Sequence, residues 1–135
     1  MMHIDWSSVP QMGIPEMDED HRQMVHLLNR FFGIAQDDED NQATETLDEL
    51  IKITRAHFVR EGALLDKHGY PELHLHKAEH DGLLRDVGSY LEHRKRGEVP
   101  KQLTFETAQF LLGWLREHIL RTDIKYPPFL RHLGT

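Results

Sequence analysis

Seven side chains of the types that bind metal ions stand at helical spacing within apolar stretches of this chain of 135 residues. Five are imidazoles and two are carboxylates: His21, His57, Glu61, His76, His80, His118 and Asp123. They fall in four separate segments, each of which has the periodicity of an amphipathic helix. A tetrahedral ion takes four ligands, so seven are too many for one such ion. They suit two ions of higher coordination number that share bridging carboxylates.

Two pairs in this set have the spacing that brings side chains together on a helix. His57 and Glu61 are four residues apart, and so are His76 and His80. Residues at this spacing have Cβ atoms roughly 5–6 Å apart, so both can reach a common ion. One such pair can arise by chance, but here all four segments place an imidazole or a carboxylate on the apolar stripe. Burying so many polar groups without partners would cost several kcal/mol, which favours metal ions as their partners.

The remaining pair, His118 and Asp123, is five residues apart. In a regular α-helix this spacing turns the carboxylate about 140° away from the imidazole. The two can converge if the helix loosens into a π-type bulge, or if the carboxylate reaches sideways to bridge two ions. We therefore predict an irregularity in the helix between these residues.

Composition limits the function classes that fit. The chain is 39% hydrophobic and 29% charged, as in an ordinary globular protein. The net charge of −7, with no visible basic cluster, argues against a nucleic-acid partner. With no cysteine, disulfides, thiolate ligands and thiol catalysis are excluded. Apolar runs are far shorter than the roughly 20 residues that span a bilayer, and residues 1–5 do not resemble a signal peptide. We expect a cytoplasmic protein without membrane insertion.

Hydrophobic periodicity predicts four helices that follow an extended arm. Residues 1–17 form the arm. The first helix begins near Asp18, a plausible N-cap, and ends by the polar residues 37–41. The second helix takes in residues 47–65 and stops at Gly69.

The last two helices are also bounded by recognisable residues. Pro71 suits the first turn of the third helix, and residues 95–97 close that helix. Thr104 can cap the fourth helix. Pro127 and Pro128 end the segment that follows it, because proline cannot continue a helix.

Short connections between these helices favour antiparallel neighbours. The expected fold is therefore all-α, an up-down-up-down antiparallel four-helix bundle with an extended N-terminal arm. Residues 1–135 form one domain, because the chain has room for one core. Within it we expect an arm at 1–17, the bundle at 18–123 and a C-terminal tail at 124–135.

The segments around the candidate ligands closely resemble the hemerythrins. The resemblance is carried by H-x-x-x-E in His57-Phe58-Val59-Arg60-Glu61, by Tyr70-Pro71 followed by His76-Lys77-Ala78-Glu79-His80, and by Trp114-Leu115-Arg116-Glu117-His118-Ile119 with Asp123. The opening Ile4-Asp5-Trp6 and Gly13-Ile14-Pro15-Glu16-Met17-Asp18 with His21 resemble the bacterial single-domain branch, the bacteriohemerythrins. One departure is Gly62, where an acidic residue or its amide often follows the bridging glutamate.

The resemblance implies two iron ions, bridged by a solvent-derived oxo or hydroxo group, as the cofactor. It assigns His76, His80 and His118 to one iron, His21 and His57 to the other, and Glu61 and Asp123 to both as bridges. Dioxygen would bind at the vacant position of the second iron. His26 and His74 lie off the apolar stripes and are expected to be spectators.

Four apolar residues flank the ligands: Phe58, Trp114, Leu115 and Ile119. From the periodicity alone they belong to the core, and the resemblance implies that they also wall a dioxygen pocket. The expected function is reversible dioxygen binding, either for storage or for delivery to an unidentified protein recipient. We expect no enzymatic activity.

Other functions stay open from the sequence. An oxygen, redox or nitric oxide sensor would usually need an output domain, for which we see no room in this chain. A di-iron enzyme that handles peroxide or nitric oxide is a further alternative. A structural zinc site is disfavoured by the number of ligands.

Overall fold

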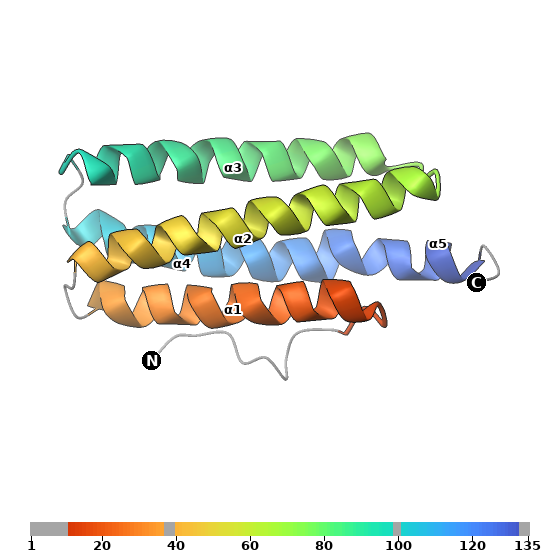
Figure 1. Ribbon diagram of the computed structural model, residues 1–135, viewed down its shortest axis with the longest axis horizontal. Coiled ribbons are helices and arrows are strands. Elements are labelled where there is room, and N and C mark those ends of the chain that lie inside the picture. The colour runs from red at the N-terminus through yellow and green to blue at the C-terminus, as the bar shows by residue number, and fades with distance from the viewer. Residues whose placement is uncertain (1–10, 37–39, 99–100, 133–135) are drawn as a thin grey trace.

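Four long helices, with their axes roughly side by side, form the body of the protein (Figure 1). The computed structural model describes residues 11–36, 40–98 and 101–132. The helices are α1 (Pro15–Gln36), α2 (Asp40–Lys67), α3 (Leu73–Lys95) and α4 (Lys101–Glu117). Each runs opposite to the one before it, which confirms the predicted up-down-up-down bundle (Figure 1).

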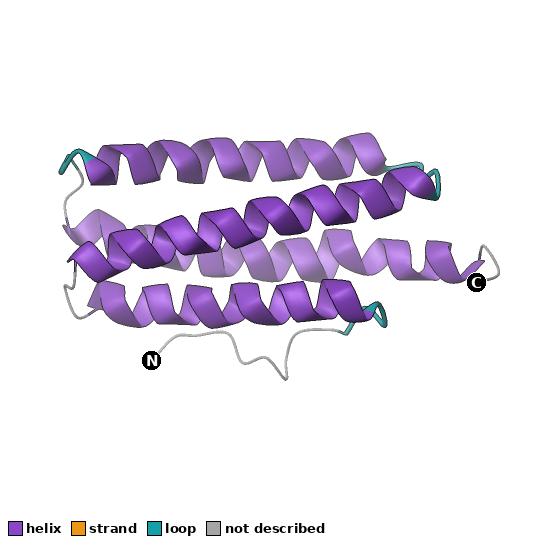
Figure 2. Cartoon of the chain, in the orientation of Figure 1, coloured by secondary structure: helices purple, strands orange, loops and turns teal. Residues whose placement is uncertain are grey.

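The described parts of the chain contain helices and connecting loops, without strands (Figure 2). None of these described helices combines the length and the apolar character needed to cross a membrane.

Two glycines end helices as the sequence predicts. Gly69, with φ of 66°, follows α2, and Gly97, with φ of 71°, follows α3. The N–H of Tyr70 donates to the carbonyl of Leu65 at 3.0 Å, and the N–H of Gly69 donates to the carbonyl of Asp66 at 3.1 Å. This is the Schellman pattern, in which a residue with positive φ lets the chain turn back onto the last helical carbonyls.

Three helix starts differ from their sequence predictions. Helix α1 begins at Pro15, not near Asp18, because proline fits the first helical position. The Asp18 carboxylate accepts hydrogen bonds from the N–H groups of Met12 and Gly13, at 2.7 and 3.1 Å, and so fastens the preceding turn. Helix α3 begins at Leu73, so Pro71 lies in the turn before it. Helix α4 begins at Lys101, so the prediction that Thr104 caps it is wrong.

The largest difference lies after α4. The chain continues through a π-helical turn η2 (His118–Thr122), a 3-10 turn η3 (Asp123–Lys125) and a short helix α5 (Tyr126–His132). Pro127 and Pro128, which we expected to end this segment, lie inside the first turn of α5. Proline is tolerated there because the first N–H groups of a helix have no partner within it. Of the predicted arm, residues 1–10 lie outside the described part.

Two apolar clusters enclose the centre of the bundle. The larger draws on the four long helices and includes Phe31, Leu47 and Leu115. The smaller combines Met12, Leu65, Tyr70 and Tyr126. The polar residues described next contact both clusters, so the core holds them on two sides.

Candidate metal centre

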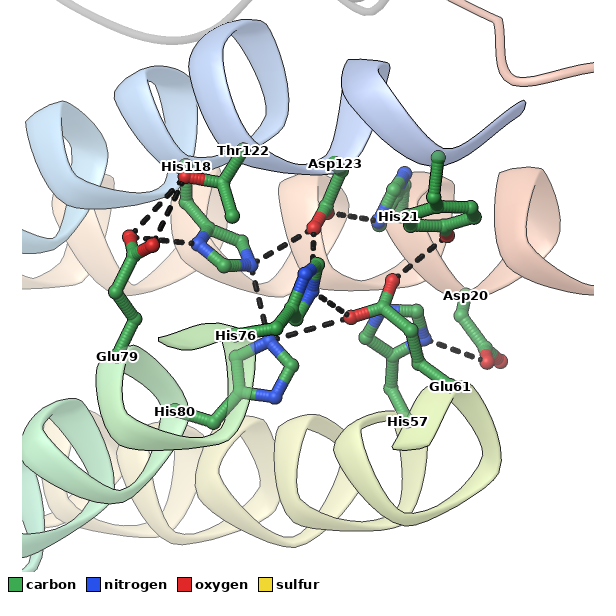
Figure 3. A network of polar contacts seen from close by, with 11 residues as sticks. Asp20, His21, His57, Glu61, His76, Glu79, His80, His118, Thr122 and Asp123 are labelled. Atoms are coloured by element: carbon green, nitrogen blue, oxygen red, sulfur yellow. Dashed lines mark hydrogen bonds and ion pairs between the residues drawn. The ribbon is translucent and has the colours of Figure 1, made fainter. Parts of the chain in front are cut away.

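The seven residues singled out in the sequence come together in the middle of the bundle (Figure 3). They come from α1, α2, α3 and the segment that follows α4. Every one of them is buried, and the largest exposed fraction is 4%, at His80. Side chains of this polarity are rarely buried unless they have strong partners, so their burial together indicates a functional site.

The predicted irregularity between His118 and Asp123 is confirmed. Residues His118–Thr122 form a π-helical turn, in which the N–H of Asp123 bonds to the carbonyl of His118, five residues earlier. The wider turn brings Asp123 back to the face that carries His118. As a result, Nε2 of His118 lies 2.9 Å from Oδ1 of Asp123.

The candidate ligand atoms divide into two groups, and within each group all atoms lie within 4.8 Å of one another. The first group is Glu61, His76, His80, His118 and Asp123. The second is His21, His57, Glu61 and Asp123. Both carboxylates belong to both groups. The first group therefore has three imidazoles and the second has two, and Glu61 and Asp123 lie between the two sets of imidazoles.

Each carboxylate turns one oxygen toward each group. Oε1 of Glu61 lies 2.7 Å from Nε2 of His76 and 3.2 Å from Nε2 of His80. Its other oxygen, Oε2, lies 3.4 Å from Nε2 of His57. This is the arrangement of a bridging carboxylate.

Asp123 repeats the pattern. Its Oδ1 lies 3.0 Å from Nε2 of His76 and 2.9 Å from Nε2 of His118, and its Oδ2 lies 3.1 Å from Nε2 of His21. Two residues from different elements therefore offer the same kind of bridge.

Several of these atoms lie close together without hydrogen bonding. Nε2 of His21, Nε2 of His57 and both oxygens of Asp123 are buried and have no hydrogen-bond partner. Buried polar atoms almost always have a hydrogen-bond partner. These atoms lie close together without the geometry of hydrogen bonds, which indicates that they share a metal ion as their partner.

The separations also fit a particular coordination geometry. With metal–ligand bonds of about 2.1 Å, neighbouring ligand atoms are about 3.0 Å apart in an octahedron and about 3.4 Å apart in a tetrahedron. Most of the nitrogen–oxygen distances above are close to the octahedral value. The residues therefore fit metal ions of high coordination number.

Nδ1 of His57 contacts Asp20, whose carboxylate forms an ion pair with Arg60. Asp20 accepts hydrogen bonds from Nε and Nη2 of Arg60, at 3.1 and 2.6 Å. Burial alone would raise the pKa of Asp20, but its bonds with His57 and Arg60 hold the pKa below its ordinary value. The ionised carboxylate can only accept, so Nδ1 of His57, at 2.9 Å, donates to it, and Nε2 is the nitrogen left to bind an ion.

His118 has a similar support on its outer side. Its Nδ1 lies 3.3 Å from Oε1 of Glu79, whose carboxylate also accepts hydrogen bonds from the hydroxyl of Thr122 at 3.2 and 3.0 Å (Figure 3). Glu79 is 45% exposed, so this support is at the edge of the bundle.

A tyrosine completes the surroundings of Glu61. The hydroxyl of Tyr126 donates to Oε2 of Glu61 at 2.8 Å, and the tyrosine is fully buried. Burial and the nearby carboxylates of Glu61 and Asp123 raise the pKa of Tyr126 above its ordinary value. The phenol therefore stays protonated and remains a donor.

The imidazoles and carboxylates shift one another's pKa values. Burial alone would lower the pKa of His57 and of His76, but bonds to carboxylates outweigh it and raise each pKa to about 9. Burial would raise the pKa of Glu61 and of Asp123, yet the histidines that surround them hold both pKa values below their ordinary range. Both carboxylates are thus ionised, and bound cations would replace protons on the histidines.

Aromatic rings cover the candidate ligands on one side. Phe58 lies flat on His80, with ring centroids 3.5 Å apart, and Trp114 stacks on His118 at 4.5 Å. Beside them is a cavity of about 30 Å³, lined by apolar side chains and by Thr54. Trp114 and Leu115 line this cavity, whereas Phe58 and Ile119 do not.

The remaining histidines and the unpredicted residues can be placed as well. His26 and His74 are exposed and stand apart from the centre.

Asp20, Glu79 and Tyr126 were not identified in the sequence. Asp20 and Glu79 each directly precede a candidate ligand, which was a usable signal, whereas Tyr126 gave none because its contact depends on the irregular turns before α5.

The fold and the buried centre define the class of the protein, and comparison with known proteins agrees. Residues 12–130 match the hemerythrin HHE cation binding domain, and the chain belongs to the hemerythrin family. The bacteriohemerythrin of Pseudomonas aeruginosa (strain LESB58) is 30% identical over 132 residues, which are 98% of this chain and 84% of the relative. That of Clostridium acetobutylicum is 27% identical over 125 residues, covering 90% and 96%.

Solved structures show the same relationship. The crystal structure of a wild-type hemerythrin superposes with a TM-score of 0.85 at 26% identity, over 95% of this chain and 96% of that one. The resemblance stated from the sequence is confirmed at the level of the family and of the bundle.

Replacing a candidate ligand should cost metal binding, whereas replacing an exposed histidine should not. Loss of a residue that hydrogen-bonds to a metal ligand lowers metal affinity roughly ten- to hundredfold. His118→Ala removes a candidate ligand itself, so we expect it to lower the metal affinity by more than that. The substitution also removes one neighbouring imidazole each from Glu79 and from the buried carboxylate of Asp123, so the melting temperature should fall. Metal content and thermal unfolding of purified protein check this. The control is His74→Ala, and equal metal retention in the two variants would show that His118 is not a ligand.

Proposed function

We propose that the seven buried residues bind two iron ions and that the chain binds dioxygen reversibly, for oxygen storage or delivery. The observation that carries the proposal is the pair of ligand groups that share Glu61 and Asp123. His76, His80 and His118 would hold one ion, and His21 and His57 the other. A solvent-derived oxo or hydroxo group would complete the bridge between them.

The donor set supports iron in this role. Imidazole and carboxylate ligands together suit first-row transition metals, whereas a structural zinc site is usually a closed set of four ligands. The relatives described above are named as bacteriohemerythrins, which favours iron over the other metals that imidazole binds. With five imidazoles the site differs from the glutamate-rich sites of ferritin-like di-iron proteins.

Two iron ions held by these seven residues would supply two electrons to dioxygen and would recover them when dioxygen leaves. The surrounding residues determine whether that exchange stays reversible. Phe58 and Trp114 shield the rings of His80 and His118, and Leu115 and Ile119 are buried beside them. Apolar walls exclude water and protons, which favours release of dioxygen over its reduction.

The cavity beside Trp114 supports the same function. Among the described residues that line it, none carries an ionisable side chain, and Thr54 supplies a hydroxyl. A volume of about 30 Å³ is above the roughly 10–15 Å³ that a cavity needs to hold one water molecule. The space is therefore large enough for a small apolar molecule.

The direct test of reversible binding is an oxygenation cycle. Protein loaded with iron(II) under anaerobic conditions is exposed to air and then degassed, while its visible absorption is followed. We expect a charge-transfer band to appear with oxygen and to disappear on degassing over repeated cycles, and zinc-loaded protein to show neither change. Oxygen uptake without recovery of the starting spectrum, or sustained turnover of peroxide, would contradict reversible binding.

The apolar wall can be tested at Ile119. This side chain is 1% exposed, so in Ile119→Glu the new carboxyl is desolvated and its pKa is raised, which makes it a proton source near neutral pH. We expect the oxygenated form to decay to the ferric state several times faster than in the wild type. The measurement is the first-order loss of the oxygenated band in air at matched iron content.

The matched control is Leu120→Glu, which makes the same change at the adjacent residue, where the side chain is 42% exposed. We expect this variant to decay like the wild type. If folded, fully loaded Ile119→Glu also decays at the wild-type rate, Ile119 does not guard the centre.

A further inference from the structure

Tyr126 links the last helix to the candidate metal centre. It is the first residue of α5 and lies three residues after Asp123. Its buried ring packs edge-on against Tyr70 at 6.2 Å and lies 5.8 Å from the ring of His76. These contacts fix the ring in place and aim its hydroxyl at Glu61.

The hydroxyl selects one of the two oxygens of Glu61. It donates to Oε2, the oxygen that faces His57, at 2.8 Å. The other oxygen, Oε1, faces His76 at 2.7 Å and His80 at 3.2 Å. The tyrosine therefore supports the side of the carboxylate that belongs to the group with two imidazoles.

The carboxylate of Glu61 needs such support because its plane can rotate about the last torsion of the side chain. The last torsion of a glutamate side chain is broad, so the carboxylate can rotate at little cost. Two imidazoles hold Oε1, whereas the imidazole that faces Oε2, that of His57, lies farther away, at 3.4 Å. Without the phenol, the plane can turn and withdraw Oε2 from the second group.

We propose that Tyr126 is a positioning residue that holds Glu61 in its bridging orientation, and that its hydroxyl supports metal binding at the His21 and His57 group far more than at the group with three imidazoles. The inference rests on the proposed two-metal function. It adds that one hydroxyl outside the ligand set controls the two ions unequally.

The two groups differ in ways that should separate their affinities. One offers three imidazoles and the other two, with the same two carboxylates. In the smaller group Nδ1 of His21 is also buried without a hydrogen-bond partner, so this imidazole lacks the outer support that Asp20 gives His57. The group with three imidazoles should therefore fill first.

The test is a titration of the metal-free protein with cobalt(II) under anaerobic conditions, followed by absorption and by calorimetry. For the wild type we expect two ions per chain in two steps. His21→Ala, which removes an imidazole of the smaller group, identifies the step that belongs to that group. In Tyr126→Phe we expect this step to weaken about tenfold or more, and the tighter step to stay within about twofold of the wild type.

The matched control is Tyr70→Phe. Tyr70 packs against Tyr126 in the same cluster, but its hydroxyl donates to Glu72 at 3.3 Å, outside the centre. This variant removes a phenol hydroxyl from a tyrosine of the same cluster, and we expect both of its binding steps to match the wild type. A general effect of loosened packing would instead change both variants alike.

The outcomes separate the inference from the function on which it rests. If the wild type binds fewer than two ions, the two-metal proposal fails. If it binds two and Tyr126→Phe retains both steps, or loses affinity equally at both, Tyr126 does not position Glu61. Zinc-loaded wild-type protein gives an independent measurement should Tyr126→Phe fail to fold. Its Tyr126 hydroxyl proton should exchange slowly in NMR spectra, and fast exchange would overturn the inference.

Discussion

Two carboxylates buried at the centre of the bundle, Glu61 and Asp123, are the groups on which the rest of the site depends. Both have an exposed fraction of 0%, and both are held ionised by the imidazoles around them. A buried charge without a partner costs several kcal/mol, so the fold must bring positive partners to these two groups. Helices α1, α2 and α3 and the segment after α4 each supply histidines for this purpose.

The same requirement explains the break in the last long helix. A regular continuation of α4 would turn Asp123 away from His118, and one of the two carboxylates that the ligand groups share would be lost. The π-helical turn and the short 3-10 turn that follows it place His118, Asp123 and Tyr126 on one side of the chain. Irregular helical turns of this kind occur frequently at functional sites, because a regular helix cannot supply the needed register.

The sequence predicted the parts of this structure that follow from helical periodicity. The spacing of His57 with Glu61 and of His76 with His80 places each pair on one face, and the structure brings these pairs together. The spacing of His118 and Asp123 predicted the π-helical turn for the same reason.

The contacts that the sequence did not predict depend on packing between helices or on irregular turns. The bond between Asp20 and His57 joins residues 37 positions apart, and that between Tyr126 and Glu61 joins residues 65 apart. Pro127 and Pro128 predicted the end of a helical segment, but proline is also compatible with the first turn of a helix, and both lie in the first turn of α5. Local sequence patterns thus predicted the candidate ligands. The residues that hydrogen-bond to those ligands could be identified only once the packing of the helices was known.

The measurement that tests the central claim most directly is the number of iron ions bound per chain. Protein purified from iron-replete cells is analysed for metals and for protein concentration in the same sample. The two ligand groups with shared carboxylates predict two iron ions per chain. A reproducible value of one iron ion per chain, or zinc alone, would contradict the assignment of these seven residues to a di-iron centre.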